Sequence, residues 1–242
     1  MCVILVCPDE NARPTRDVLE ACHEANPHGA GMAWREGGKV RWMKNLDVDD
    51  AEALLEELDG EVVIHFRWAS VGGIDADLCH PFPVARWAKT DLFGEADTVL
   101  FHNGTWPAYD AALNRLRHDH GKRLPRGPMS DTRAAAVCAH HLGRRILSKL
   151  PGRWVWMYAG QKTRLYGDWS EFRGMKVSNR NFLRRLNRRP APFEWADEED
   201  GFDAADQPEL WMGEGPENGA PNGATARGTA TSLGQLTTLT DY

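Results

Sequence analysis

Hydrophobic residues form short, nearly continuous runs at intervals along roughly the first 180 positions of the chain. The runs that are richest in β-branched and aliphatic residues lie at 2–7, 61–67 and 98–101. Runs of this length and type predict strands that are buried on both faces. Because the first run begins at Cys2, we expect the chain to start inside its own core.

Other apolar segments are short and closely spaced. Segments 31–34 and 40–43 flank Gly37-Gly38, a pattern typical of a hairpin with a glycine turn. Further along the chain, segments 154–158, 163–166 and 175–178 predict the strands of a meander.

Three segments have the spacing of amphipathic helices. They cover about 15–25, 49–58 and a longer stretch that opens at Ser130-Asp131-Thr132. In the longest one, apolar residues step by three and four from Ala134 to Ile146, which predicts one buried face. Basic residues Arg144, Arg145 and Lys149 suit the negative C-terminal end of such a helix. Strands mixed with helices predict an α+β domain in which helices cover antiparallel sheets.

The pattern of hydrophobic runs ends near residue 194. We assign 1–194 to one folded domain and 195–242 to an acidic tail rich in Gly, Ala and Thr, which we predict to be disordered. The alternative is a docking segment that binds a partner through its final stretch, which contains Leu233, Leu236 and Leu239.

Composition limits the class of protein. The chain has 242 residues, of which 42% are hydrophobic and 26% charged, and its odd number of cysteines, five, does not fit a disulfide scaffold. No apolar run approaches the roughly 18–20 residues that span a bilayer, and the N-terminus lacks the pattern of a signal peptide. We therefore expect a cytoplasmic protein with reduced thiols and no membrane contact.

The net charge of −6 hides two opposed parts. Residues 192–242 contain eleven acidic residues and one Arg, a net of −10, which leaves +4 for residues 1–191. Basic residues gather between Arg173 and Arg189. A solvated surface is the favoured interpretation of this stretch, ahead of contact with nucleic acid or a phosphorylated acceptor.

Cys2 is the first candidate for chemistry. A buried cysteine usually only fills space. If the initiator Met is removed, however, Cys2 becomes the N-terminal residue, and its thiol lies beside an α-amine whose unperturbed pKa of about 7.7–8.0 suits a general base. One residue would then supply a nucleophile and its base.

Other candidates follow predicted strands or open a helix. Arg67 ends a strand and can form a two-pronged contact with a carboxylate, although a salt bridge at the strand end is the alternative. Asn103 and Gly104 can donate to an oxyanion or can form a tight turn. Asp131 can bind an ammonium group or cap its helix together with Ser130. His80 lies in a loop and can line the same pocket.

Five motifs occur in an order that resembles the class II glutamine amidotransferase domain of the N-terminal nucleophile hydrolases. They are Cys2, His65-x-Arg67-Trp68-Ala-Ser70-x-Gly72, His80-Pro81, His102-Asn103-Gly104 and Ser130-Asp131-Thr132. Residues 26–34 also resemble the second-strand region of that family, and the resemblance spans roughly residues 2–180.

The resemblance implies a four-layer αββα sandwich of two antiparallel sheets and a set of roles. Cys2 would be the nucleophile, with its free amine as base, and Asn103 with Gly104 would form the oxyanion hole. The glutamine α-carboxylate would be held by Arg67 and its α-ammonium by Asp131. The substrate pocket would be completed by Trp68, Ser70 and His80.

The function implied is hydrolysis of the glutamine side-chain amide through a thioester, with ammonia supplied to a separate acceptor enzyme. One alternative is a stand-alone amidohydrolase of a γ-glutamyl amide or peptide. Another is a non-catalytic regulatory or binding module on the same scaffold.

The chain departs from the family pattern at three positions. Val3 replaces a common Gly, Ser70 replaces a more usual Thr, and Val71 stands where some members have His. No cofactor or metal is expected, because neither His118-x-His120 nor His140-His141 has further ligands at a suitable spacing.

Overall fold

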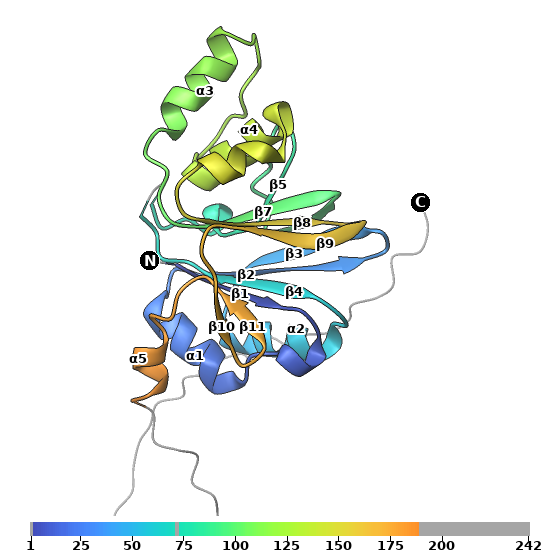
Figure 1. The fold of residues 1–242 in the computed structure, drawn as a ribbon, viewed down its shortest axis with the longest axis vertical. Helices are drawn as coiled ribbons and strands as arrows, with labels where there is room; N and C mark the ends of the chain where they lie inside the picture. The colour runs from blue at the N-terminus through green and yellow to red at the C-terminus, as the bar shows by residue number, and fades with distance from the viewer. Residues whose placement is uncertain (1, 71–72, 189–242) are drawn as a thin grey trace, which may run out of the picture. The chain divides into compact units, whose positions relative to one another are not determined.

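The computed structural model describes residues 2–70 and 73–188. Within this part, the chain forms two antiparallel sheets that face each other, with helices on both outer sides (Figure 1). The predicted tail, 195–242, and the domain boundary at 194 lie outside the described residues.

The larger sheet contains seven strands in the described part of the chain, and each is antiparallel to its neighbours. Their order across the sheet is β10 (Ser170–Phe172), β11 (Met175–Val177), β1 (Val3–Cys7), β4 (Val62–Phe66), β2 (Ala30–Glu36), β3 (Lys39–Leu46) and β6 (Phe93–Ala96). The N-terminal strand β1 therefore lies inside the sheet, between β11 and β4.

The smaller sheet has four described strands, also antiparallel. Their order is β5 (Phe82–Pro83), β7 (Thr98–Asn103), β8 (Arg153–Tyr158) and β9 (Gln161–Tyr166). Strand β7 is fully buried along its length, as its apolar run predicted.

Helices cover the outer faces of both sheets (Figure 1). The larger sheet packs against α1 (Arg16–Ala25) and α2 (Val48–Glu57), and α5 (Leu183–Leu186) contacts α1. The smaller sheet packs against α3 (Tyr109–His118), α4 (Asp131–Leu142) and the 3-10 helix η3 (Arg144–Lys149). Two further 3-10 helices, η1 (Glu10–Ala12) and η2 (Ala76–Leu78), lie in connections.

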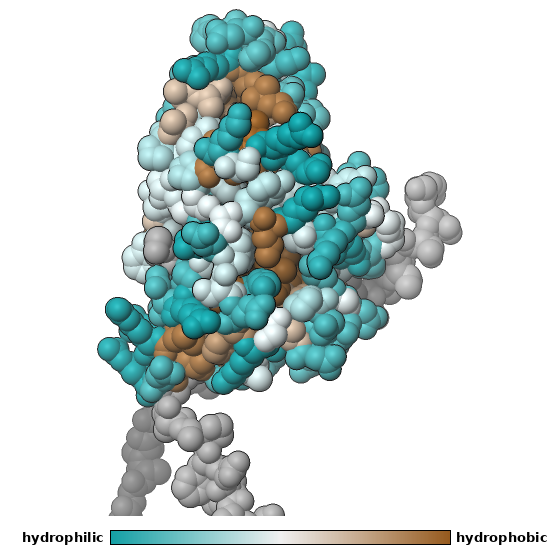
Figure 2. Space-filling model, viewed as in Figure 1, coloured by the Kyte–Doolittle hydropathy of each residue, from teal (hydrophilic) through white to brown (hydrophobic). Residues whose placement is uncertain are grey.

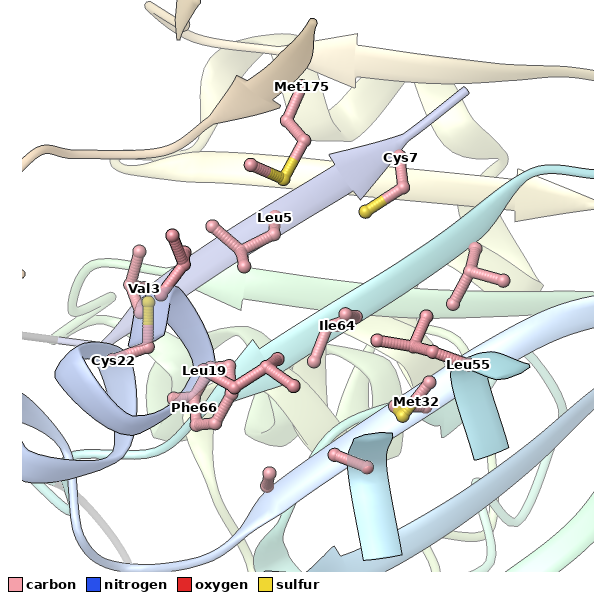
Figure 3. Packing of buried hydrophobic residues seen from close by; sticks show 14 of the residues in the cluster. Val3, Leu5, Cys7, Leu19, Cys22, Met32, Leu55, Ile64, Phe66 and Met175 are labelled. Atoms are coloured by element: carbon pink, nitrogen blue, oxygen red, sulfur yellow. The ribbon is translucent and has the colours of Figure 1, made fainter. Parts of the chain in front are cut away.

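Strand β1 shows why this arrangement forms four layers. Successive side chains of a strand point to opposite faces, so Val3, Leu5 and Cys7 pack against the outer helices, as Figure 3 shows, while Ile4 and Val6 pack between the two sheets. All five residues are at most 4% exposed. The expected αββα sandwich of two antiparallel sheets is therefore confirmed.

Two local predictions were wrong. Segment 175–178 does not continue a meander with β9, because β11 lies in the other sheet and pairs with β1. The helix that starts at Asp131 ends at Leu142, where Gly143 adopts a φ of +83°, so Ile146 lies on η3. A positive φ departs from helical geometry and is readily adopted by glycine, so the helix stops there.

The predicted hairpin is confirmed. Strands β2 and β3 pair from Ala30↔Leu46 to Glu36↔Lys39, and Gly37 and Gly38 form the turn with φ values of +59° and +74°. Positive φ at both turn positions matches the right-handed twist of the flanking strands and favours glycine.

Candidate active site

The Cys2 thiol lies where β1 begins beside the end of β4. Val3 pairs with Phe66, so the chain beyond β4 passes next to Cys2. The Trp68 backbone N–H donates to Cys2 Sγ at 3.2 Å, and Sγ lies 3.4 Å from the Trp68 carbonyl oxygen. Burial raises the pKa of the Cys2 thiol, and the Trp68 backbone and the Arg67 charge lower it in part. The thiol is therefore protonated at neutral pH and needs a base before it can attack.

Seven of the eight predicted site residues line one pocket. The lining includes Cys2, Arg67, Trp68, Ser70, His80, Gly104 and Asp131, together with Ala69, Leu78, His102, Ser130 and Thr132. These residues come from both sheets, from the loop after β4 and from the start of α4. The cavity measures about 20 Å³, which is room for a single water molecule.

Arg67 supplies positive charge to this pocket and is only 4% exposed. Its backbone N–H donates to the Gly29 carbonyl at 3.0 Å, which holds the end of β4 against the start of β2. Its guanidinium group donates to the carbonyl oxygens of Gly73, at 2.6 Å, and Asp75, at 3.4 Å. A guanidinium group binds a carboxylate more strongly than a carbonyl, so Arg67 has the chemistry to bind a carboxylate.

Asp131 supplies the opposite charge as the first residue of α4. Its carboxylate accepts hydrogen bonds from the backbone N–H groups of Trp106 and Thr132, both at 2.8 Å. Ser130 caps the helix, because its hydroxyl accepts from the Arg133 backbone N–H at 3.1 Å. Ser130 and Asp131 thus both accept from backbone N–H groups of the first helical turn, as the capping alternative predicted, and the Asp131 residue also lines the pocket.

Asn103 ends β7 and Gly104 follows it, but the two residues face different surroundings. Gly104 lines the pocket with a φ of +152°, and a Cβ atom there would come within 2.8 Å of Gly152 Cα, so the position requires glycine. The Asn103 side chain is 1% exposed and does not line the pocket, and its Nδ2 donates to Ser178 Oγ at 2.8 Å. The structure therefore brings Gly104 to the pocket and holds Asn103 just behind it.

Ser178 and Asn179 make contacts near Cys2 that the sequence pattern did not reveal. Ser178 Oγ accepts from the Ile4 backbone N–H at 2.8 Å, and Asn179 Nδ2 donates to the Cys2 carbonyl at 2.6 Å. Both residues follow directly on β11, so they reach Cys2 only because β11 pairs with β1. The available signal was a pair of polar residues after a short strand, with nothing in the spacing to connect them to Cys2.

Two of the lining residues, His80 and His102, are buried histidines, and a third buried histidine, His65, lies beside them. The rings of His65 and His80 are 3.9 Å apart, and His80 Nδ1 accepts from the His102 backbone N–H at 3.5 Å. Burial lowers the pKa of His65 to about 3, and burial also lowers the pKa of His80 and His102. The Asp131 carboxylate opposes this effect at His102, whose Nδ1 is 3.6 Å from Asp131 Oδ2. These imidazoles are therefore neutral at pH 7.

Residues 2–70 and 73–188 contain no group of three or more His, Cys, Asp or Glu side chains arranged to hold a metal ion. All five cysteines are free thiols. In the same part of the chain, no helix is both long and apolar enough to cross a membrane.

No family model and no curated protein matches the sequence. Among solved structures, the chain is similar to a glutamine phosphoribosylpyrophosphate amidotransferase from B. subtilis in complex with ADP and GMP, with 19% identity and a TM-score of 0.45 over 66% of this chain and 35% of that enzyme. It is also similar to a structure described as the allosteric regulatory enzyme of purine biosynthesis, with 19% identity and a TM-score of 0.44 over 66% of this chain and 36% of the other. The chain thus spans about a third of the length of each.

Proposed function

We propose that this protein hydrolyses the side-chain amide of glutamine, with Cys2 as the nucleophile. The observation that carries the proposal is that the Cys2 thiol, the Arg67 guanidinium and the Asp131 carboxylate line one pocket. Glutamine has an α-carboxylate, an α-ammonium and an amide, so each of its three polar groups has one candidate partner of suitable chemistry.

The reaction requires that Met1 is removed and that the α-amine of Cys2 is free. The amine takes the thiol proton as Sγ attacks the amide carbon, which forms the S–C bond and a tetrahedral oxyanion. The C–N bond then breaks as the protonated amine passes its proton to the leaving nitrogen, so ammonia departs and a γ-glutamyl thioester remains. Water attacks this thioester with the same amine as base, and glutamate and the free thiol are released.

The oxyanion would be bound by the Gly104 backbone N–H and the Asn103 side-chain amide. Gly104 already lines the pocket. The Asn103 amide has two N–H groups, so one can keep its bond to Ser178 while the other donates to the oxyanion. Donors that are held in place before the reaction stabilise the charge that develops in the transition state.

The ammonia would be used by a separate acceptor enzyme. The sandwich takes up nearly all of residues 2–188, and we propose that the acceptor site belongs to a partner protein. The larger γ-glutamyl amides remain the second class of substrate, since they share the half of glutamine that Arg67 and Asp131 would bind.

The test measures release of ammonia and glutamate from glutamine. The protein used is one for which mass spectrometry shows that Met1 has been removed. Cys2→Ala should abolish the activity, whereas Cys138→Ala, a buried thiol on α4 outside the pocket lining, should retain it. Activity only on larger γ-glutamyl amides would favour the amidohydrolase. Full activity of Cys2→Ala would overturn the mechanism, and retention of Met1 with no activity on any γ-glutamyl compound would favour a binding module.

A further inference from the structure

A second concave site lies on the outer side of the smaller sheet's helical layer, between the chain after β5 and the chain after α3. Its lining, which we call the basic groove, consists of Trp87, Arg117, Gly121, Lys122, Arg123, Leu124 and Arg126. The groove has a volume of about 730 Å³, within the range of small-molecule sites. Figure 2 shows a hydrophilic surface where α3 ends and the chain turns back towards α4.

The charge of the basic groove is strongly positive. Four of its seven lining residues are Arg or Lys, and all four are exposed. Segment 115–126 contains five Arg or Lys residues and a single acid, Asp119. Among the described residues, none of the four cationic side chains has a carboxylate within 4.0 Å, in contrast to Arg16 and Lys39, which form ion pairs. The groove therefore presents positive charge that the described chain does not neutralise.

The two walls of the basic groove are held together by a buried residue. Arg133 is 4% exposed, and its guanidinium donates to the carbonyls of Trp87 and Ala88 on one wall and to those of Arg126 and Pro128 on the other. Its distances to these four carbonyl oxygens range from 2.6 to 3.3 Å. A buried cation whose donors all go to neighbouring backbone fixes the spacing of the walls, so the groove is built before any ligand arrives.

An aromatic side chain stands among these charges. Trp87 is 44% exposed, and the Arg86 guanidinium lies over its ring at 4.7 Å from the centroid. An exposed indole beside several cationic groups can stack with a flat ring while the cations bind phosphate. This combination differs from a merely solvated basic surface, which has no reason to expose a tryptophan.

We propose that the basic groove binds a nucleotide, with its base stacked on Trp87 and its phosphates held by Arg117, Lys122, Arg123 and Arg126. The ligand is either a free nucleotide or one unit of a single nucleic-acid strand, because both offer a flat base and phosphate. Arg133, which joins the groove walls, is two residues beyond Asp131, so the first turn of α4 serves both sites. This proposal does not depend on glutamine hydrolysis.

Calorimetric titration of the full chain tests the proposal with four probes: ATP, inorganic tripolyphosphate, adenosine and a ten-residue oligothymidylate. We expect ATP to bind with one site per chain, tripolyphosphate to bind more weakly and adenosine to show no binding. In Arg123→Ala/Arg126→Ala, ATP affinity should fall about tenfold or more. In Trp87→Ala, ATP should bind no more tightly than tripolyphosphate. The control Arg144→Ala/Arg145→Ala removes two exposed cations outside the groove and should bind ATP as the original chain does.

Tighter binding of the oligothymidylate than of ATP, with the same dependence on Trp87 and Arg123, would identify a strand as the source of the nucleotide. Absence of ATP and oligothymidylate binding at millimolar concentration would overturn the proposal. An equal loss of ATP affinity in Arg123→Ala/Arg126→Ala and in the control Arg144→Ala/Arg145→Ala would also overturn the proposal. Such a result would show only nonspecific attraction between ATP and the positive charge of the protein.

Discussion

The side-chain amide of Asn103 donates to the hydroxyl of Ser178 at 2.8 Å and so joins the end of β7 in the smaller sheet to the end of β11 in the larger one. The same hydroxyl accepts from the Ile4 backbone N–H on β1, the strand that directly follows Cys2. One buried oxygen thus bonds both to a residue of the proposed oxyanion site and to the strand that follows the proposed nucleophile.

Ser178→Ala should weaken both stability and activity. It leaves the Ile4 N–H and the Asn103 amide without a shared acceptor, which we expect to cost about 1–3 kcal/mol of unfolding free energy. Because Asn103 loses its anchor, kcat for glutamine should fall while KM changes little. Urea unfolding and steady-state kinetics measure the two effects, with the exposed Ser148→Ala as control. An unchanged kcat would show that the bridge is only structural.

Asp131→Asn should act on substrate binding. The amide keeps the size of the carboxylate but cannot offer a charge to an α-ammonium, so we expect KM for glutamine to rise about tenfold or more. Asp110→Asn changes an exposed residue of α3 and serves as the matched control. The assignment of Asp131 to the ammonium group fails if the variant has the original KM.

Gly104→Ala should disturb the pocket because the backbone conformation at this position favours glycine. The residue has a φ of +152°, and the added Cβ would lie 2.8 Å from Gly152 Cα and 2.9 Å from His102 Nε2. Strain at such a position is of the order of 1–3 kcal/mol, and we expect a lower Tm and loss of activity. The control is Gly160→Ala, whose new Cβ would meet only the Tyr158 side chain at 3.3 Å. Its Tm and its activity should both change much less than those of Gly104→Ala.

His65 should make stability depend on pH. Burial lowers its folded pKa to about 3 from an ordinary value of 6.5, so between these values the unfolded chain binds a proton that the folded chain does not. The stabilisation is fully present above pH 6.5 and is lost as the pH falls towards 3, at about 1.4 kcal/mol per pH unit. Urea unfolding between pH 8 and pH 5 measures the slope.

The matched variant for this pH dependence is His65→Gln, which removes the titrating ring. Its absolute stability is not the readout, because any change at a fully buried position is expected to cost stability. The readout is the slope of unfolding free energy against pH, compared between His65→Gln and the original chain. His80 and His102 will keep part of the dependence, so the slope should decrease in the variant without vanishing, and an identical slope would rule out His65 as a contributor.

The apolar runs predicted the buried strands well because burial on both faces leaves a strong local signal, whereas the four-layer sandwich was implied by the family resemblance. Strand β1 is buried on both sides, and its five apolar residues admit few other structures. The 3-10 helix η3 was missed because Ile146 continues the spacing of α4, and apolar spacing alone does not show that Gly143 turns the chain. Strand β6 escaped notice because its residues are exposed or half-buried.

The sequence by itself determined which chemical groups are present: a thiol at the second position, an arginine after a buried strand and a carboxylate at the start of a helix. These signals are local, since each depends on a residue and its immediate neighbours. Only the tertiary structure decided that Ser178 and Asn179 reach Cys2, that Asn103 turns to Ser178, and that Arg133 joins two distant segments into a groove. Such contacts depend on strand order and on pairing between segments far apart in the chain, and no local pattern encodes that order.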